Sequence, residues 1–255
     1  MARLHMGERG TRQLWHEITI WTQLHHPFIV QLVGMAWHGQ YPMVVSEFYE
    51  EGSLYEANKE EMRHSSTSPC DVQATSQELC APRNPADQLK LSSAAEGKLS
   101  SGAEGPRSDR LLVEWMHNIA SAMQYLHSLA PIPVLHRNLK SSNCLLTNRG
   151  QNLLVTDFNT SCLLTADMTP AVGSTRWMAP ELLHDQAYSE KTDVYAYGMV
   201  CYEMLTRQLP FSSYSLHQAA LKVSSGKRPA LPTSCSRWVE ELITACWQAS
   251  VQAQS

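Results

Sequence analysis

The chain has 255 residues, of which 43% are hydrophobic and 17% are charged, and its formal net charge is −4. This length fits one large domain or two small lobes. The mildly acidic balance gives no reason to expect nucleic acid or an anionic membrane as a partner. Seven cysteines at scattered spacings argue against a disulfide framework or a structural metal site and favour a reducing compartment.

The first residues lack the apolar core of a secretory signal. No apolar run approaches the length of about 18 residues that a membrane-spanning helix needs. From these two observations we expect a cytoplasmic protein with no membrane span.

Composition divides the chain into three parts. Residues 11–56 and 111–255 contain patterned apolar residues, whereas residues 57–110 are rich in Ser, Glu, Ala, Lys and Pro. The middle part has almost no aromatic or β-branched residues, so it cannot bury enough apolar surface to offset the entropy of ordering. We therefore predict a largely disordered insert at 57–110. Whether it is an inert loop or a phosphorylated tether stays open.

In the first part, apolar residues recur at spacings of three and four from Leu14 to Leu24, which predicts a helix. Pro27 would end that helix. Short apolar runs at 28–33 and 43–45 predict strands.

In the last part, a long apolar stripe predicts a helix over 111–128. Two short strands are predicted at 144–146 and 153–155, on either side of an Asn-Arg-Gly turn. Two further buried helices are predicted over 194–205 and 238–247.

Four sequence motifs follow one another in this last part. They are His-Arg-Asn-Leu-Lys-Ser-Ser-Asn at 136–143, Asp-Phe-Asn at 157–159, a segment ending in Ala-Pro-Glu at 173–181, and Asp-Val-Tyr-Ala-Tyr-Gly at 193–198. They resemble the H-R-D-L-K-x-x-N, D-F-G, A-P-E and D-x-Y-x-x-G motifs of protein kinases. Because they occur in the family's order at plausible spacing, the chain resembles the protein kinase superfamily. The resemblance is strongest to the tyrosine-kinase-like group, which includes mixed-lineage and Raf-type kinases.

The resemblance implies an α+β, bilobal protein-kinase-like fold. Residues 11–56 would form a partial N-terminal lobe with helix C, strands 4–5 and the hinge, and 111–255 a mainly helical C-terminal lobe that is truncated at its C-terminal end. We expect the N-terminal lobe to be truncated as well. Only 16 residues precede Glu17, too few for three strands and the Gly-rich loop that covers the nucleotide phosphates.

The resemblance also implies catalytic and metal-binding roles. Asn138 stands where kinases have the catalytic Asp, and Lys140 would face the terminal phosphate. Asn143 and Asp157 match the two Mg²⁺ ligands, and oxygen donors are what Mg²⁺ requires. Asn159 replaces the Gly of D-F-G, which restricts the backbone without forbidding φ > 0.

Other residues match the nucleotide pocket of the family. Glu17 matches the helix C residue that pairs with a strand Lys, although no Lys occurs before position 59. Ser46 matches the gatekeeper, Glu47 and Tyr49 belong to the hinge, and Leu145 follows the catalytic loop. The implied cofactors are ATP and Mg²⁺, provided that the nucleotide site is retained.

A stack of side chains is implied between the two lobes. Trp21 matches a helix C position that contacts the Phe of D-F-G, here Phe158. Leu32 and His136 would extend this stack at its two ends.

Three functions are compatible with these features. The first is a catalytically impaired pseudokinase that acts through protein partners in signalling, because an amide at Asn138 has no useful basicity. The second is an active ATP-dependent Ser/Thr protein kinase, with a protein substrate, in a longer form of which this chain is a fragment. The third is a scaffold that uses neither nucleotide nor metal.

Overall fold

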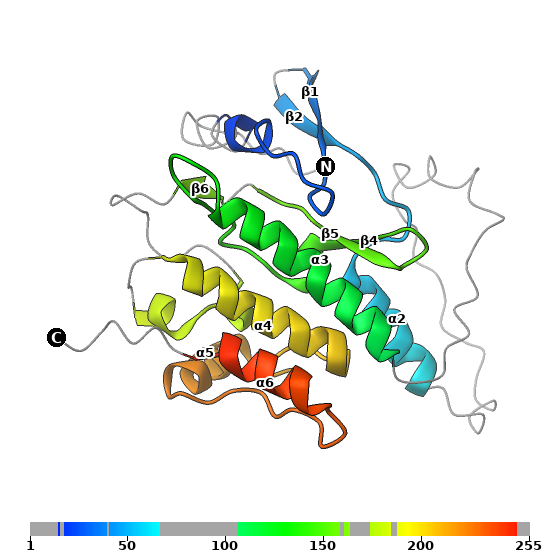
Figure 1. The fold of residues 1–255 in the computed structure, drawn as a ribbon, viewed down its shortest axis with the longest axis vertical. Coiled ribbons are helices and arrows are strands. Elements are labelled where there is room, and N and C mark those ends of the chain that lie inside the picture. Colours follow the sequence, from blue (N-terminus) through cyan, green and yellow to red (C-terminus); the bar gives the residue numbers. More distant parts are fainter. Residues whose placement is uncertain are drawn as a thin grey trace, which may run out of the picture.

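The computed structural model describes residues 15, 18–39, 41–66, 107–158, 161–163, 174–184 and 188–248. Small β-sheets and a larger set of helices make up a mixed α+β fold (Figure 1). This mixture agrees with the α+β class predicted from the sequence. No helix within the described ranges is long and apolar enough to cross a membrane.

The N-terminal part contains a helical segment and one hairpin. Residues 18–21 are helical and pass into a turn ahead of Pro27, as predicted. Strand β1 (Leu32–His38) pairs antiparallel with β2 (Tyr41–Ser46), with Leu32 opposite Ser46.

The strand predicted at 28–33 is wrong in position, because β1 begins at Leu32. Val30 N donates to Val155 O at 3.0 Å, and Val155 N donates to Phe28 O at 2.9 Å. Residues 28–30 therefore contact strand β5 (Asn152–Val155) through an isolated parallel bridge between Ile29 and Val155. An apolar run does not reveal which partner satisfies its backbone.

Helix α2 (Leu54–Ser66) corrects the predicted extent of disorder. Residues 57–66 are helical, and so are 109–110, which open helix α3 (Asp109–His127). The helix α2 starts in a capping box, in which Glu56 accepts from Ser53 N at 2.8 Å and Glu56 N donates to Ser53 Oγ at 3.3 Å. The disorder-like composition averaged over 57–110 outweighed this helix-start signal at Ser53 and Glu56. The remainder of the predicted insert, 67–106, lies outside the described residues.

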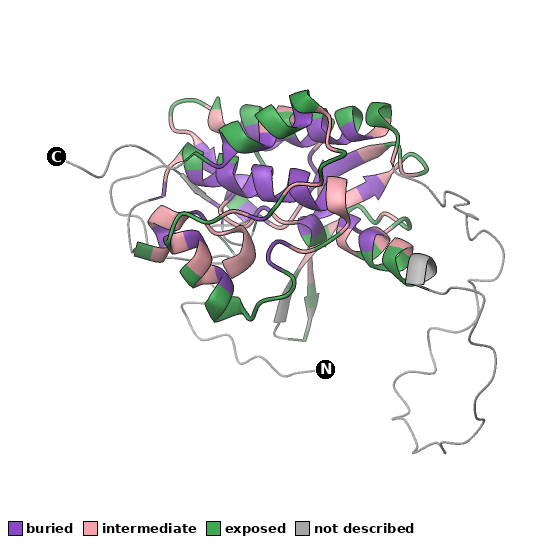
Figure 2. Cartoon of the chain, turned by 90° about the horizontal axis from the view of Figure 1, so that it is seen from below, coloured by how far each residue is buried: buried purple, intermediate pink, exposed green. Residues whose placement is uncertain are grey.

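Helices α3 and α4 (Glu190–Thr206) form the centre of the helical part. Ser108 caps α3 by accepting from Leu111 N. Helix α4 is buried along most of its length, between α3 and α6 (Arg237–Cys246). Figure 2 shows buried residues gathered in this centre and exposed residues along its rim. The helices predicted at 111–128, 194–205 and 238–247 are confirmed, with shifted ends.

Gly198 sits where α4 meets the end of α6. A Cβ at this position would lie 2.7 Å from Cys246 Cβ and 2.9 Å from two atoms of the Trp247 ring. Only a residue without a side chain allows the two helices to approach so closely. The last Gly of the D-x-Y-x-x-G motif is therefore explained by packing.

Two short antiparallel strand pairs flank the motif residues. Strands β4 (Cys144–Thr147) and β5 are joined by the predicted turn at 148–150, whose three residues all have positive φ. Strand β3 (Val134–Leu135) pairs with β6 (Cys162–Leu163). The 136–143 motif thus lies between β3 and β4, and Asp157 comes just after β5.

Helix α5 (Leu216–Ser224) completes the helical part and begins in a capping box made by Ser215 and Gln218. It packs against two 3-10 helices, Thr175–Trp177 and Pro180–His184, which contain the A-P-E segment.

Candidate functional site

The first turn of α4 positions the 136–143 loop. Asp193 is only 2% exposed, and its two carboxylate oxygens accept from His136 N and Arg137 N, each at 2.9 Å. His127 Nε2 lies 3.0 Å from Asp193 Oδ2. Arg137 has φ 67°, a backbone conformation that needs such external support in a non-glycine residue. One buried carboxylate, Asp193 of α4, therefore holds the start of the loop in place.

Three rings form the predicted stack. The centroids of Trp21 and Phe158 are 5.3 Å apart, and those of His136 and Phe158 are also 5.3 Å apart in an edge-to-face arrangement. Trp21 Nε1 donates to Val30 O at 2.8 Å. Burial lowers the pKa of His136, so its ring stays neutral and suits an apolar stack. The prediction for these three residues is confirmed, and Leu32 is partly buried against the same core.

Three of the residues predicted to act in catalysis and metal binding, Asn138, Asn143 and Asp157, come together around one carboxylate oxygen. Asp157 Oδ2 accepts from Asn138 Nδ2 at 3.1 Å and from Asn143 Nδ2 at 3.0 Å. Asn143 Nδ2 also donates to the backbone oxygen of Asn138 at 2.8 Å. Asp157 itself has φ 70°. The loop and Asp157 thus form one polar cluster.

Lys140 and Ser174 join this cluster from the side of the A-P-E segment. Lys140 Nζ donates to Ser174 Oγ at 3.1 Å, and Ser174 Oγ donates to Asn138 Oδ1 at 3.3 Å. The motifs alone did not assign Ser174 to the site. Its place in the segment that ends in Ala-Pro-Glu was the signal that could have assigned it to the site.

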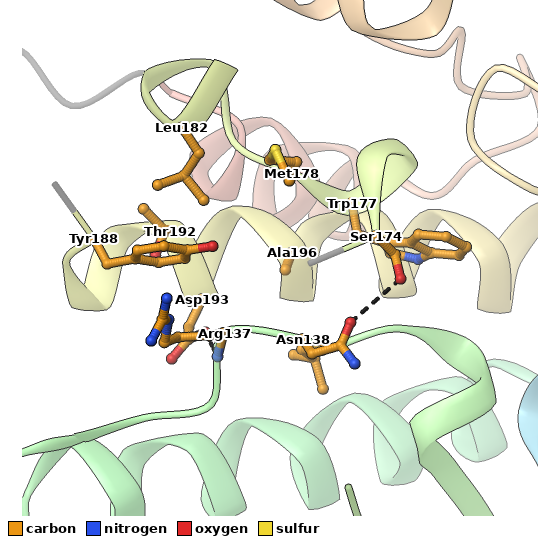
Figure 3. A pocket seen from close by; sticks show the side chains of 11 residues that line it. Arg137, Asn138, Ser174, Trp177, Met178, Leu182, Tyr188, Thr192, Asp193 and Ala196 are labelled. Carbon is orange, nitrogen blue, oxygen red and sulfur yellow. Dashed lines mark hydrogen bonds between the residues drawn. The ribbon is translucent and has the colours of Figure 1, made fainter. Parts of the chain in front are cut away.

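A pocket lies beside Asn138, between the 136–143 loop, the A-P-E segment and α4 (Figure 3). Its lining combines polar groups of the loop with apolar side chains. The labelled lining residues are Arg137, Asn138, Ser174, Trp177, Met178, Leu182, Tyr188, Thr192, Asp193 and Ala196. The guanidinium of Arg137 stacks over the Tyr188 ring at 4.3 Å.

The oxygen donors of this cluster fit a nucleotide-bound Mg²⁺ in type. Mg²⁺ is usually held by one or two carboxylates together with substrate phosphates and water, and Asp157 and Asn143 supply a carboxylate and an amide. Within the described ranges no group of three or more His, Cys, Asp or Glu is arranged to hold a metal. In the structure Asn143 turns its Nδ2 toward Asp157, so it would have to present Oδ1 instead to bind a cation.

The predicted hinge residues lie between β2 and α2. Tyr49 donates from its hydroxyl to Glu47 Oε2 at 2.5 Å, and Ser46 Oγ donates to Glu47 O at 3.3 Å. Burial, together with the Glu47 carboxylate, raises the pKa of Tyr49 to about 12. The hinge is tied to β4 because Leu146 N donates to Gly52 O at 2.8 Å, next to half-buried Leu145. Glu17 lies outside the described residues.

A second buried carboxylate was missed by sequence reasoning. Glu203 is 1% exposed and accepts from Ser141 Oγ at 2.6 Å and from Trp177 Nε1 at 2.5 Å. Burial raises its pKa to about 7. Glu203 thus connects α4, the 136–143 loop and the A-P-E segment. The signal was a single charge within the otherwise uncharged stretch 194–205.

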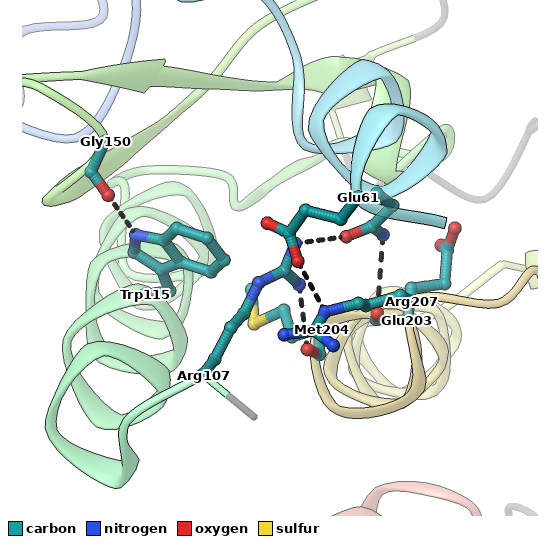
Figure 4. Close-up of polar contacts among 8 residues, drawn as sticks. Glu61, Arg107, Trp115, Gly150, Glu203, Met204 and Arg207 are labelled. Atoms are coloured by element: carbon teal, nitrogen blue, oxygen red, sulfur yellow. Dashed lines mark hydrogen bonds and ion pairs between the residues drawn. The ribbon is translucent and has the colours of Figure 1, made fainter. Parts of the chain in front are cut away.

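Arg107 forms a further polar cluster, which joins α2 to the end of α4 (Figure 4). Its side chain is 5% exposed. The guanidinium donates to Met204 O at 2.9 Å, Asn58 Oδ1 at 2.6 Å and Glu61 Oε1 at 3.0 Å. It also lies 4.8 Å from the centroid of the Trp115 ring. Sequence reasoning placed this residue in the insert and missed its role.

Comparison with known proteins decides the family. The family model described as "Protein tyrosine and serine/threonine kinase" matches residues 1–254. The chain belongs to the protein kinase superfamily. The prediction of this superfamily, within the tyrosine-kinase-like group, is confirmed.

Several curated kinases are similar to parts of this chain. Mitogen-activated protein kinase kinase kinase 7 of Drosophila melanogaster is 39% identical over 137 residues, which is 53% of this chain and 20% of the relative. Serine/threonine/tyrosine-protein kinase HT1 of Arabidopsis thaliana is 43% identical over 133 residues, 51% of this chain and 33% of the relative. Serine/threonine-protein kinase VIK of the same plant is 29% identical over 245 residues, 92% of this chain and 46% of the relative. The chain spans less than half the length of each of these relatives.

Proposed function

We propose that this chain is a kinase-fold protein with impaired phosphoryl transfer, which acts in the cytoplasm by binding protein partners in signalling. The observation that carries the proposal is the amide of Asn138. In active kinases a carboxylate at this position accepts or orients the proton of the substrate hydroxyl. An amide has no useful basicity, and a general base contributes about 10²–10⁴ in rate.

The surroundings of Asn138 support this proposal. Its Oδ1 accepts from Ser174 and its Nδ2 donates to Asp157. Both ends of the side chain therefore have hydrogen-bond partners within the protein. A substrate hydroxyl at this position would meet an amide in place of a carboxylate.

ATP and Mg²⁺ are the cofactors that this site would take. Asp157 and Asn143 would hold the cation, and Lys140 would face the terminal phosphate. Ser46, Glu47, Tyr49 and Leu145 would line the adenine side. Bound Mg²⁺ would neutralise the charge of the phosphates. A protein that binds partners without transferring phosphate would need this neutralisation only to hold the nucleotide.

The test combines nucleotide binding with phosphate transfer. The purified chain is melted with increasing Mg-ATP and is assayed for transfer of labelled phosphate to a protein substrate, beside Asp157→Asn. Asp109→Asn is the matched control, because Asp109 is an exposed carboxylate at the start of α3. We expect phosphate transfer no higher in the parent than in Asp157→Asn. Robust transfer by the parent that Asp157→Asn abolishes would overturn the proposal, whatever the melting shift.

An active Ser/Thr kinase in a longer form is the second candidate. It is favoured by the retained arrangement of Lys140, Asn143 and Asp157 around one cluster. The coding sequence upstream of this chain tests this candidate. This candidate requires a Gly-rich loop and a strand with a Lys there, and phosphate transfer by the longer protein; absence of either would exclude it.

A further inference from the structure

A directed chain of hydrogen bonds runs from Lys140 to Asp157. Lys140 Nζ donates to Ser174 Oγ at 3.1 Å, Ser174 Oγ donates to Asn138 Oδ1 at 3.3 Å, and Asn138 Nδ2 donates to Asp157 Oδ2 at 3.1 Å. Every bond points in the same sense, from an ammonium group to a carboxylate. Bonds aligned in this way polarise one another and strengthen the whole chain.

An amide at position 138 completes this chain, whereas a carboxylate does not. The group must accept from Ser174 at one end and donate to Asp157 at the other. An ionised carboxylate accepts only, so an Asp would meet Asp157 as a second negative charge. An alanine would offer neither function. The orientation of the amide is also fixed, because the carboxylate of Asp157 is a pure acceptor and must face a nitrogen.

The amide of Asn143 points at the same oxygen. Asp157 Oδ2 therefore accepts two N–H groups, at 3.0 and 3.1 Å. Two converging donors present partial positive charge where a divalent cation would bind a carboxylate oxygen. A cation at that oxygen would have to displace both amides, and Asn138 is tied back to Ser174 and Lys140.

We propose that Asn138 is a positioning residue that holds Asp157 against divalent cations, its side-chain NH₂ taking the place of the cation. The inference rests on the proposed function, because it concerns the same site. It goes further by making Asn138 a device that sets cation affinity, in addition to an amide that lacks basicity. It also connects this affinity to Ser174 in the A-P-E segment.

The experiment measures binding of Mn²⁺ alone to the purified chain, through loss of the electron paramagnetic resonance signal of free Mn²⁺. Asn138→Ala removes the donor without adding charge, and Asn138→Asp replaces it by an oxygen ligand of the same size. Asn148→Asp is the matched control, since it makes the same exchange at an exposed position in the β4–β5 turn. Asp157→Asn removes the proposed ligand.

We expect Asn138→Ala to bind Mn²⁺ roughly tenfold more tightly than the parent, because a hydrogen bond to a charged group must be broken in the parent but not in the variant. Asn138→Asp should bind more tightly still, since a cation relieves the repulsion of two carboxylates. Asn148→Asp should match the parent, and combining Asp157→Asn with either variant should remove the gain. A merely structural role for Asn138 would instead lower the affinity on substitution.

Equal Mn²⁺ affinity in the parent, Asn138→Ala and Asn138→Asp would overturn the inference. Melting of each variant is recorded first, and the isosteric Asn138→Asp carries the test if the alanine variant does not fold. Failure here is distinguishable from failure of the proposed function. That function falls on phosphate transfer by the parent chain, whereas this inference falls on the binding of Mn²⁺ without nucleotide or substrate.

Discussion

Replacing Glu203 by Gln should remove a pH-dependent penalty on the folded state. The carboxyl group is 1% exposed, and burial raises its pKa from 4.5 to about 7. A Gln keeps the same shape: its Oε1 can accept from Trp177 Nε1, and its Nε2 can donate to Ser141 Oγ. The variant therefore retains the contacts with these two side chains, gives up the hydrogen bond from the backbone N–H of Ser141, and has no proton to lose.

The direction and the size of this effect on the free energy of unfolding follow from the linkage between proton binding and folding. Between pH 4.5 and about 7 the folded chain holds a proton on Glu203 that the unfolded chain has released, so folding stability falls as pH rises through this window. The shift of about 2.5 pKa units (from 4.5 to about 7) corresponds to ~3 kcal/mol at 1.36 kcal/mol per unit. The penalty levels off only about one pH unit above the folded-state pKa of about 7.

Urea unfolding of the parent and of Glu203→Gln, at intervals from pH 5 to pH 8, measures this effect. Other carboxylates contribute their own pH dependence, so the relevant quantity is the difference between the two proteins. We expect the free energy of unfolding of the variant to gain on that of the parent by about 2–3 kcal/mol across this range. A difference that stays constant with pH would refute the assignment of a raised pKa to Glu203.

Three further predictions concern stability. Gly198→Ala should lower the free energy of unfolding by about 1–3 kcal/mol, because a Cβ would overlap Cys246 and Trp247; an unchanged urea midpoint would contradict the packing argument. Arg107→Met should cost about 2–3 kcal/mol, since buried Asn58 Oδ1 and the Met204 carbonyl lose their donor, whereas exposed Arg110→Met should change the midpoint little. Asp193→Asn should cost about 2–3 kcal/mol, because its amide NH₂ cannot accept from a backbone N–H; thermal melting that matches the parent would show that the loop has another anchor.

The helical part was predictable because its signals are local. The stripes over 111–128, 194–205 and 238–247 repeat with the period of a helix that faces a core, and each appears in the structure. The kinase motifs placed Asn138 and Asp157 in one cluster, because family order fixes which loops meet. Their hydrogen bonds confirm that they meet.

The features that could not be predicted from the sequence depend on contacts between segments that are distant in the chain. Strand β1 begins later than the apolar run because residues 28–30 bond to β5, far along the chain. Arg107 lies in a segment of disorder-like composition, yet it is held by Asn58, Glu61 and Met204. Composition averages over a window, so it cannot detect a single guanidinium that closes a buried contact.

The contacts that helix α4 makes with the rest of the fold are independent of the side chain at position 138. Asp193 holds the 136–143 loop, Gly198 admits α6, and Glu203 fastens the A-P-E segment. None of these three contacts involves the side chain of Asn138. The residue at position 138 can therefore be exchanged without a change in the three contacts by which α4 holds the loop, the end of α6 and the A-P-E segment.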